Sequence, residues 1–460
     1  MTELPGFLKC GDAARLIPVL ADTNREQRIA SIFLSLLPQI PSLAHEIFST
    51  VGLRVGKRTK IEAFTEVVLK EADNAMNRPD GLIIVSTGQK SWSALVEAKI
   101  GTARLDEDQV QRYLEMARTN GLDAVITISN EFVARADHSP VSVPKTLLRK
   151  VDLFHWSWTW IATQCEILAY KRAVEDTEQA FLLDEIRRFF NHPSTGIQRF
   201  TQMGKGWKDL NQAITNNATL KKTSQEVEEG VACWFEEERD LCLQLSRHVG
   251  QPVETVIERK LRDDPAARIK NGINNLVADR SLISAFRIPD SAGDIEVKAD
   301  LALRTVSASM RIKAPQDRKS TKARVNWLLR MLIEDDPRIL ILAHWPGRAP
   351  ATDAALSVLR EDPEALQSDN KDATPHTFEV RLVERLGKRF AGNRTFIEDV
   401  ERIVPAFYDL VGQHLRAWQP PPPKPVKSSI TSDDSAGENE PTEVPSENWA
   451  EARPETQTRH

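Results

Sequence analysis

Two neighbouring stretches decide the fold of the N-terminal half: Arg78-Pro79-Asp80-Gly81-Leu82-Ile83-Ile84-Val85 and Ser93-Ala94-Leu95-Val96-Glu97-Ala98-Lys99-Ile100-Gly101. Each joins a run of aliphatic residues to turn-forming residues, which predicts two strands connected by a turn. Side chains two residues apart share one face of a strand, so Glu97 and Lys99 point the same way. If the strands pair antiparallel, Asp80 at the start of the first lies beside Glu97 near the end of the second.

Two carboxylates beside a lysine form a donor set with a definite chemistry. Hard carboxylate oxygens suit Mg²⁺, with Mn²⁺ as a substitute, and Mg²⁺ uses one or two protein carboxylates together with phosphate oxygens. A bound cation lowers the pKa of a water molecule and offsets charge on a phosphoryl transition state. Lys99 would orient that water or help to deprotonate it. The expected reaction is hydrolysis of a phosphodiester bond.

A helix expected over residues 105–119 adds a second feature. Gln109 and Tyr113 stand four residues apart and therefore share a helical face, from which both could reach a substrate backbone. Together with Pro79-Asp80 and Glu97-x-Lys99, this QxxxY element resembles the PD-(D/E)xK nuclease superfamily, over roughly residues 20 to 170. The resemblance implies a restriction-endonuclease-like core, a mixed β-sheet flanked by helices, and assigns catalytic roles to Asp80, Glu97, Lys99, Gln109 and Tyr113.

The resemblance also implies a third metal ligand, because an acidic residue on the first core helix often joins the site. Glu26 is the matching residue, so the expected metal ligands are Asp80, Glu97 and Glu26. Glu66, in a strand-like segment, is the alternative.

An ExK triplet alone is weak support, because the chain repeats it at Glu258-Arg259-Lys260 and Glu296-Val297-Lys298. What favours the triplet at 97–99 is its context: the preceding Asp-Gly strand start, the alternating apolar residues and the downstream QxxxY helix. The competing structural explanation is a turn aspartate and a cross-strand surface pair.

Four regions follow from the patterning of the whole chain. Residues 1–200 are the nuclease-like domain with N-terminal helices, 201–250 a helical connector, 251–416 a second α/β domain, and 417–460 a Pro-rich and then acidic tail that is expected to be disordered. The first region should contain helices within 12–51, strands at 61–69, 81–86, 93–100, 124–128 and 151–158, and helices at 105–119, 160–170 and 181–190. After a helix from 223 to 250, the second should contain helices at 253–277, 322–333 and 395–415 and strands at 282–288, 295–303, 306–312, 339–344 and 377–383.

The charge of the chain is unevenly distributed. The formal net charge is −5, but the segment from Gln419 onward holds four basic and eight acidic side chains, so the rest is near neutral. A basic cluster in the second α/β domain is a candidate DNA-contacting surface, since clustered cations release phosphate counterions. Its proposed nucleic-acid-binding residues are Arg311, Lys313, Lys319, Lys322 and Arg324.

The chain begins without an export signal, contains no apolar run of membrane-spanning length, and has four cysteines without a CxxC pair. These features predict a cytoplasmic protein that does not enter a membrane. The resulting hypothesis is a prokaryotic Mg²⁺-dependent deoxyribonuclease in repair, restriction or defence, whose C-terminal domain recognises DNA, a protein partner or a second copy of the chain. The alternative is a catalytically silent nuclease-like module that binds nucleic acid or protein.

Overall fold

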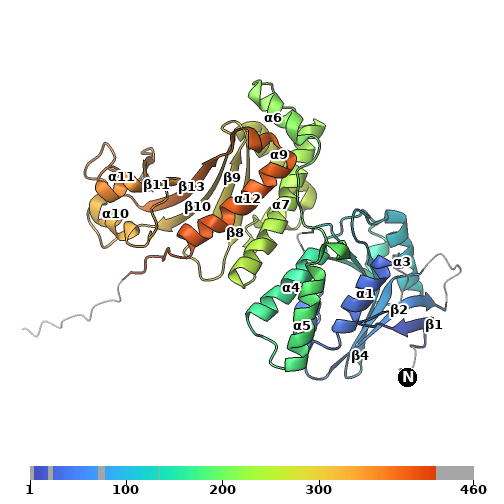
Figure 1. Cartoon of the computed structure of the whole chain (residues 1–460). Coiled ribbons are helices and arrows are strands. Elements are labelled where there is room, and N and C mark those ends of the chain that lie inside the picture. Colours follow the sequence, from blue (N-terminus) through green and yellow to red (C-terminus); the bar gives the residue numbers. More distant parts are fainter. Residues whose placement is uncertain (1–4, 19–23, 71–77, 134, 421–460) are drawn as a thin grey trace, which may run out of the picture. The chain divides into compact units, whose positions relative to one another are not determined.

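A computed structural model describes residues 5–18, 24–70, 78–133 and 135–420. The part of the expected tail from residue 421 to 460 lies outside the described residues. Residues up to Gln419 belong to one compact unit that contains two β-sheets, each with its own buried core (Figure 1). The fold is therefore mixed α/β, as the patterning predicts.

The first sheet is mixed, with strand order β1-β2-β3-β4-β5-β6. β1 to β4 pair antiparallel in sequence, whereas β4, β5 and β6 are parallel. The change from antiparallel to parallel pairing falls at β4, the strand that carries Glu97. The strands are β1 Leu8–Ala13, β2 Thr59–Leu69, β3 Gly81–Thr87, β4 Lys90–Ala98, β5 Ala124–Ser129 and β6 Asp152–Ser157.

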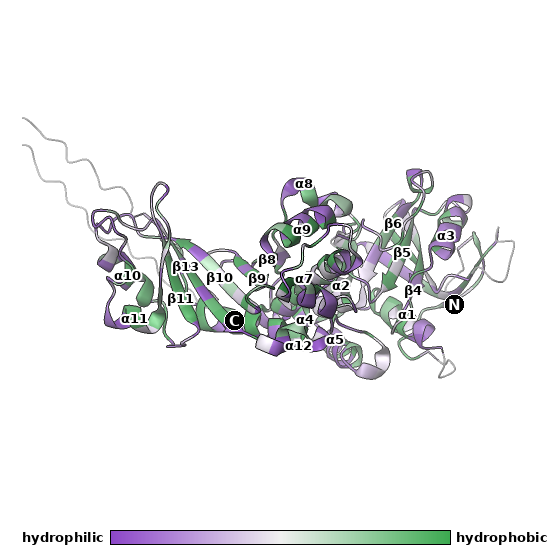
Figure 2. Ribbon diagram, turned by 90° about the horizontal axis from the view of Figure 1, so that it is seen from above, coloured by the Kyte–Doolittle hydropathy of each residue, from purple (hydrophilic) through white to green (hydrophobic). Residues whose placement is uncertain are grey.

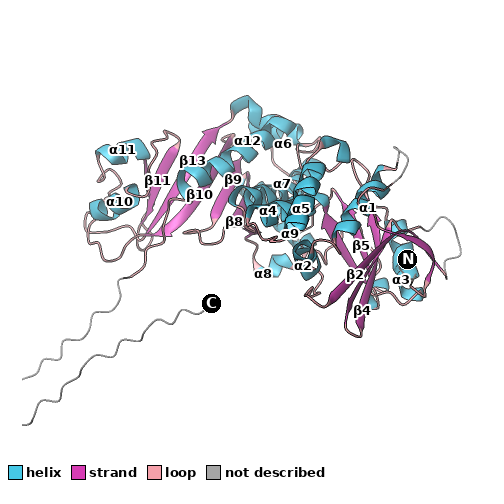
Figure 3. Ribbon diagram, turned by 60° about the horizontal axis from the view of Figure 1, so that its bottom comes forward, coloured by secondary structure: helices cyan, strands magenta, loops and turns pink. Residues whose placement is uncertain are grey.

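Helices cover both faces of this sheet (Figure 3). One core joins the sheet to α1, α2, α4 and α5, and it includes the buried side chains of Trp156 and Trp158. A second core lies on the opposite face and joins the sheet to α3. The helices of this region are α1 Arg25–Leu36, α2 Pro41–Ser49, α3 Glu107–Thr119, α4 Trp158–Tyr170 and α5 Thr177–Phe190, with short 3-10 turns at Leu147–Arg149 and Pro193–Thr195.

The start of β3 is shaped by close packing at Gly81. A side chain at this position would overlap the Leu34 side chain of α1 and lie 3.1 Å from the carbonyl oxygen of Phe64. Glycine therefore lets α1 approach the sheet directly behind Asp80.

The second sheet is antiparallel throughout, with strand order β12-β11-β13-β10-β9-β8-β7. One face of its central strands is buried, and α12 packs against β10 and β13; hydrophobic and hydrophilic residues alternate along these strands (Figure 2). The strands are β7 Glu254–Thr255, β8 Ser281–Arg287, β9 Ile295–Asp300, β10 Thr305–Lys313, β11 Ile339–His344, β12 Thr352–Ala355 and β13 Thr377–Arg385.

The longest helix of this region, α7, ends at Gly250, whose left-handed backbone (φ +66°) closes the last turn with a hydrogen bond to the Ser246 carbonyl. Its buried stripe includes Val227, Val231 and Trp234. The helices are α6 Trp207–Thr215, α7 Gln225–Val249, α8 Arg259–Arg262, α9 Pro265–Asp279, α10 Thr321–Leu329, α11 Leu356–Glu361 and α12 Asn393–Phe407; the short helical turns Gly387–Ala391 and Tyr408–Gly412 precede and follow α12.

Two of the predicted helical segments begin later than expected. The helix predicted over 253–277 is wrong at its start, where β7 and the short α8 precede α9; Pro265 occupies the first turn of α9 because it cannot donate a backbone hydrogen bond. The helical prediction from residue 12 is also wrong at its start, because Leu8–Ala13 pairs with β2 as β1. In the described part of the chain, no helix has the length and apolarity needed to cross a membrane.

Candidate active site

The register of β3 and β4 brings Asp80 to Glu97. The strands are antiparallel, and Gly81 lies opposite Val96, so Asp80 just before β3 falls at the level of the end of β4. There the backbone N–H of Ala98 donates a 2.8 Å hydrogen bond to Asp80 Oδ2. The strand end therefore holds the Asp80 carboxylate in place.

Glu97 and Lys99 lie on one face of the strand and contact each other. Lys99 Nζ is 2.5 Å from Glu97 Oε1. Glu97 is only 2% exposed, and its second oxygen, Oε2, is buried without a hydrogen-bond partner. A buried carboxylate oxygen without a partner is costly and can act as a ligand.

Burial changes the proton affinity of all three groups. Burial, reinforced by the charge of Glu97, raises the pKa of Asp80 to about 8, and burial also raises the pKa of Glu97. Burial opposes ionisation of Lys99, but the negative charge of Glu97 outweighs it and raises the pKa of the ammonium. The site thus holds one firmly charged lysine and two carboxyls that need a further cation to ionise easily.

Glu26 joins this group from α1. Its Oε2 lies 3.7 Å from Lys99 Nζ, and its Oε1 accepts a 3.3 Å hydrogen bond from the backbone N–H of Ile100. The alternative residue, Glu66, sits in β2 with a left-handed backbone (φ +53°) and is not among the charges that shift the pKa values of Asp80 or Glu97. The geometry favours Glu26 as the third acidic residue.

The two QxxxY residues of α3 are hydrogen-bonded to each other and, through Tyr113, to the segment before β3. Gln109 Nε2 donates a 2.9 Å hydrogen bond to the Tyr113 hydroxyl, which donates in turn to the carbonyl of Arg78 at 3.1 Å. Burial, together with the charge of Glu97, raises the pKa of Tyr113. Tyr113 is buried, so its hydroxyl supports the segment that carries Asp80. Asp106 caps the N-terminus of α3, because its Oδ1 accepts a 2.7 Å hydrogen bond from the backbone N–H of Gln109.

Three acidic side chains around Lys99 match the oxygen donors that Mg²⁺ and Mn²⁺ prefer. In the described residues, however, the carboxylate trio whose ligand atoms all lie within 4.8 Å of one another is Glu237, Asp240 and Glu401, in the region of the second sheet. At the first site, Lys99 lies between Glu26 and Glu97 and takes part of the space that a cation would share.

A polar row that the sequence analysis did not single out continues from Glu97 across the sheet. Glu97 pairs with Thr127 on β5, and Thr127 with His155 on β6. Thr127 Oγ1 and His155 Nδ1 are 2.9 Å apart, and His155 Nε2 is 3.0 Å from the Glu131 carbonyl oxygen. Thr127 and His155 each interrupt the apolar residues at the centre of a strand, a signal that the sequence carries.

The residues of the basic cluster have different surroundings. Arg311 pairs with buried Glu379 at 2.8 Å, and Lys322 lies 3.8 Å from Glu364. Arg324 is buried and donates to the carbonyl oxygens of residues 318 and 375, at 2.8 and 2.6 Å. Its guanidinium supports the chain, whereas Lys313 and Lys319 are exposed.

Comparisons of the chain with protein-family models, with curated proteins and with solved structures gave no match. The functional argument therefore depends on the geometry of the site.

Proposed function

We propose that the chain is a divalent-metal-dependent nuclease that hydrolyses phosphodiester bonds of DNA, with a restriction-endonuclease-like core formed by the first sheet and its helices. The observation that carries the proposal is the position of Asp80, Glu97 and Lys99 together at one strand end. The unpartnered oxygen of Glu97 and the adjacent Glu26 support it.

Asp80 and Glu97 would hold the cation, with Glu26 as a third ligand. The chemistry that a bound Mg²⁺ or Mn²⁺ supplies is activation of water and neutralisation of phosphoryl charge. Lys99 holds its positive charge beside the carboxylates, where it orients the attacking water and stabilises negative charge on the phosphoryl oxygens. Tyr113 and Gln109 position the Asp80 segment through the Arg78 carbonyl.

Digestion of plasmid and linear DNA tests the proposal. We expect wild-type protein to cleave with Mg²⁺ or Mn²⁺ and to stop when a chelator is added. Glu97→Gln and Lys99→Met should each reduce the rate by about 10²–10³-fold, because each removes a group that stabilises the transition state. Binding of uncleaved DNA should persist in both variants.

The ExK triplet Glu296-Val297-Lys298, which also lies on a strand, provides a matched control. Glu296 and Lys298 lie on β9 with the same spacing, so Glu296→Gln and Lys298→Met make the same chemical changes away from the site. These variants should cleave like wild type. If wild type and all variants bind but leave both DNA and RNA intact, the enzyme proposal fails and the binding-module alternative is favoured.

A further inference from the structure

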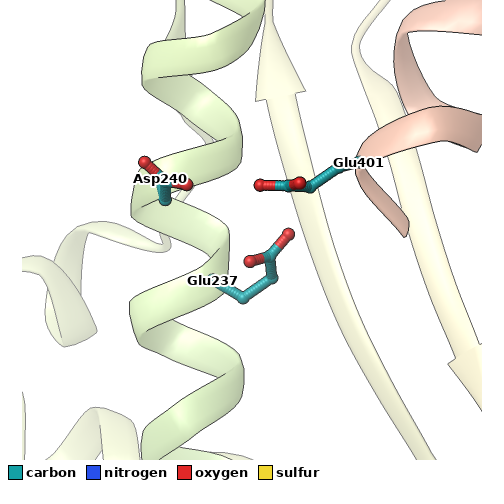
Figure 4. Close-up of side chains that lie close together, drawn as sticks. All are labelled: Glu237, Asp240 and Glu401. Atoms are coloured by element: carbon teal, nitrogen blue, oxygen red, sulfur yellow. The ribbon is translucent and has the colours of Figure 1, made fainter. Parts of the chain in front are cut away.

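Three carboxylates converge between two helices of the second region. Glu237 and Asp240 project from α7 and Glu401 projects from α12, and a ligand oxygen from each lies within 4.8 Å of the others (Figure 4). The two residues of α7 stand three positions apart and therefore share a helical face. Side chains from segments about 160 residues apart in the chain meet here.

Glu237 is the unusual member of this trio. It is 0% exposed, and neither of its two carboxylate oxygens has a hydrogen-bond partner. Its side chain extends toward the other two carboxylates (Figure 4). Oδ1 of Asp240, which is also 0% exposed, has no partner either. Burying a carboxylate oxygen without a hydrogen-bond donor is costly, so the unpartnered oxygens of Glu237 and Asp240 are available as ligands for a cation.

Two of the six carboxylate oxygens of the trio already contact nitrogen donors. Arg199 Nη2 lies 3.0 Å from Glu401 Oε1, and its Nε is 3.4 Å from Asp240 Oδ2. Gln244 donates to the same two oxygens, at 3.1 Å for Asp240 Oδ2. These donors hold Glu401 and Asp240 in place and leave both oxygens of Glu237 and Oδ1 of Asp240 without a donor.

We propose that Glu237, Asp240 and Glu401 bind a hard divalent cation, Ca²⁺ in preference to Mg²⁺, which links α7 to α12. Ca²⁺ takes six to eight oxygen ligands at about 2.3–2.6 Å in flexible geometry, and both oxygens of Glu237 and Oδ1 of Asp240, together with the Glu401 carboxylate, would supply part of that set. Mg²⁺ keeps several waters and is less suited to an enclosed cage in which two of the three ligands are fully buried. This cation is structural and separate from the one at Asp80 and Glu97.

The test is thermal unfolding of the full chain after chelator treatment and dialysis. Unfolding is measured without added metal and with Ca²⁺ or Mg²⁺ at about 1 mM. All proteins carry Glu97→Gln, so that the proposed catalytic site does not contribute. We expect Ca²⁺ to raise Tm by about 3 °C or more, and Mg²⁺ to raise it less, because a ligand that binds only the folded state stabilises it. Calorimetric titration with Ca²⁺ should give one site per chain.

Glu237→Gln is the diagnostic variant and Glu228→Gln, an exposed position on the same helix, is its matched control. Glu237→Gln should fold, since it removes a buried charge, and should abolish both the Tm shift and the calorimetric signal; Glu228→Gln should retain both. The proposal is overturned if neither cation shifts Tm, or if Glu237→Gln keeps the shift. A shift by Mg²⁺ equal to that by Ca²⁺ would overturn the assigned preference.

Discussion

Glu97 uses its two carboxylate oxygens differently. One contacts Lys99, and the other is buried without a partner, so the side chain is held in place and still able to bind a ligand. Asp80 is held by the Ala98 N–H, and its pKa is raised to about 8 by burial and by Glu97. A cation that binds both groups would favour their ionised forms, so metal binding should release protons near neutral pH.

His155, at the far end of the polar row, predicts a pH dependence of stability. Burial lowers its pKa to about 4 from the ordinary 6.5, so the folded state disfavours the protonated ring. The stability it contributes is present above about pH 6.5 and is lost as the pH falls toward 4, by up to ~3 kcal/mol. Unfolding of His155→Gln, measured over this range, should depend less on pH than that of wild type.

The exposed residue His192 provides the control for the His155→Gln experiment. His192→Gln should keep the wild-type slope. Equal slopes for wild type and His155→Gln would refute the assignment of this titration to His155.

At the level of elements, the sequence predicted the strands near the site well and the short connecting elements poorly. β3 and β4 were recognisable because their apolar runs and turn residues agree with burial on both faces. β1, β12 and α11 were missed because short segments carry few periods of any pattern and acquire their structure from neighbours. β1, for instance, exists through irregular pairing with β2.

The candidate site residues also divide into those predictable from local sequence and those that depend on tertiary packing. Glu97, Lys99, Gln109 and Tyr113 follow from spacing within single elements. The pairing of Glu237 with Glu401 depends on tertiary packing and is not contained in any local pattern. The burial of Arg324 is a similar case, because its carbonyl partner at residue 375 lies 51 positions away.

The packing of α1 on β3 predicts the effect of a single added methyl group. Gly81→Ala would force the new side chain against Leu34 and toward the Phe64 carbonyl, and should destabilise the protein by about 1–3 kcal/mol. Denaturant unfolding measures the loss. Gly56→Ala is the control, since no atom lies within 4 Å of the added group and its cost should be small. Equal stability of Gly81→Ala and wild type would show that α1 moves aside.

For the whole molecule, the proposed function requires a surface that contacts DNA outside the site. Of the basic cluster, Lys313 and Lys319 are exposed, whereas Arg324 is internal. In a Glu97→Gln background, Lys313→Gln with Lys319→Gln should weaken DNA binding and reduce the slope of log affinity against log salt by about 2, because two phosphate contacts are lost.

The matched pair for this experiment is Lys205→Gln with Lys208→Gln, two exposed lysines at the start of α6. Fluorescence anisotropy at several salt concentrations gives both affinity and slope. An unchanged slope in the Lys313 and Lys319 variant would exclude these residues from the DNA interface.

The order of the second sheet also bears on how the protein behaves at high concentration. In the described part of the chain, its outermost strands are β7, with two residues, and β12, with four. Each carries an exposed acidic side chain, Glu254 or Asp353. Short, charged edge strands offer few free backbone groups to a strand of another molecule. This seven-stranded sheet is therefore protected against edge-to-edge aggregation.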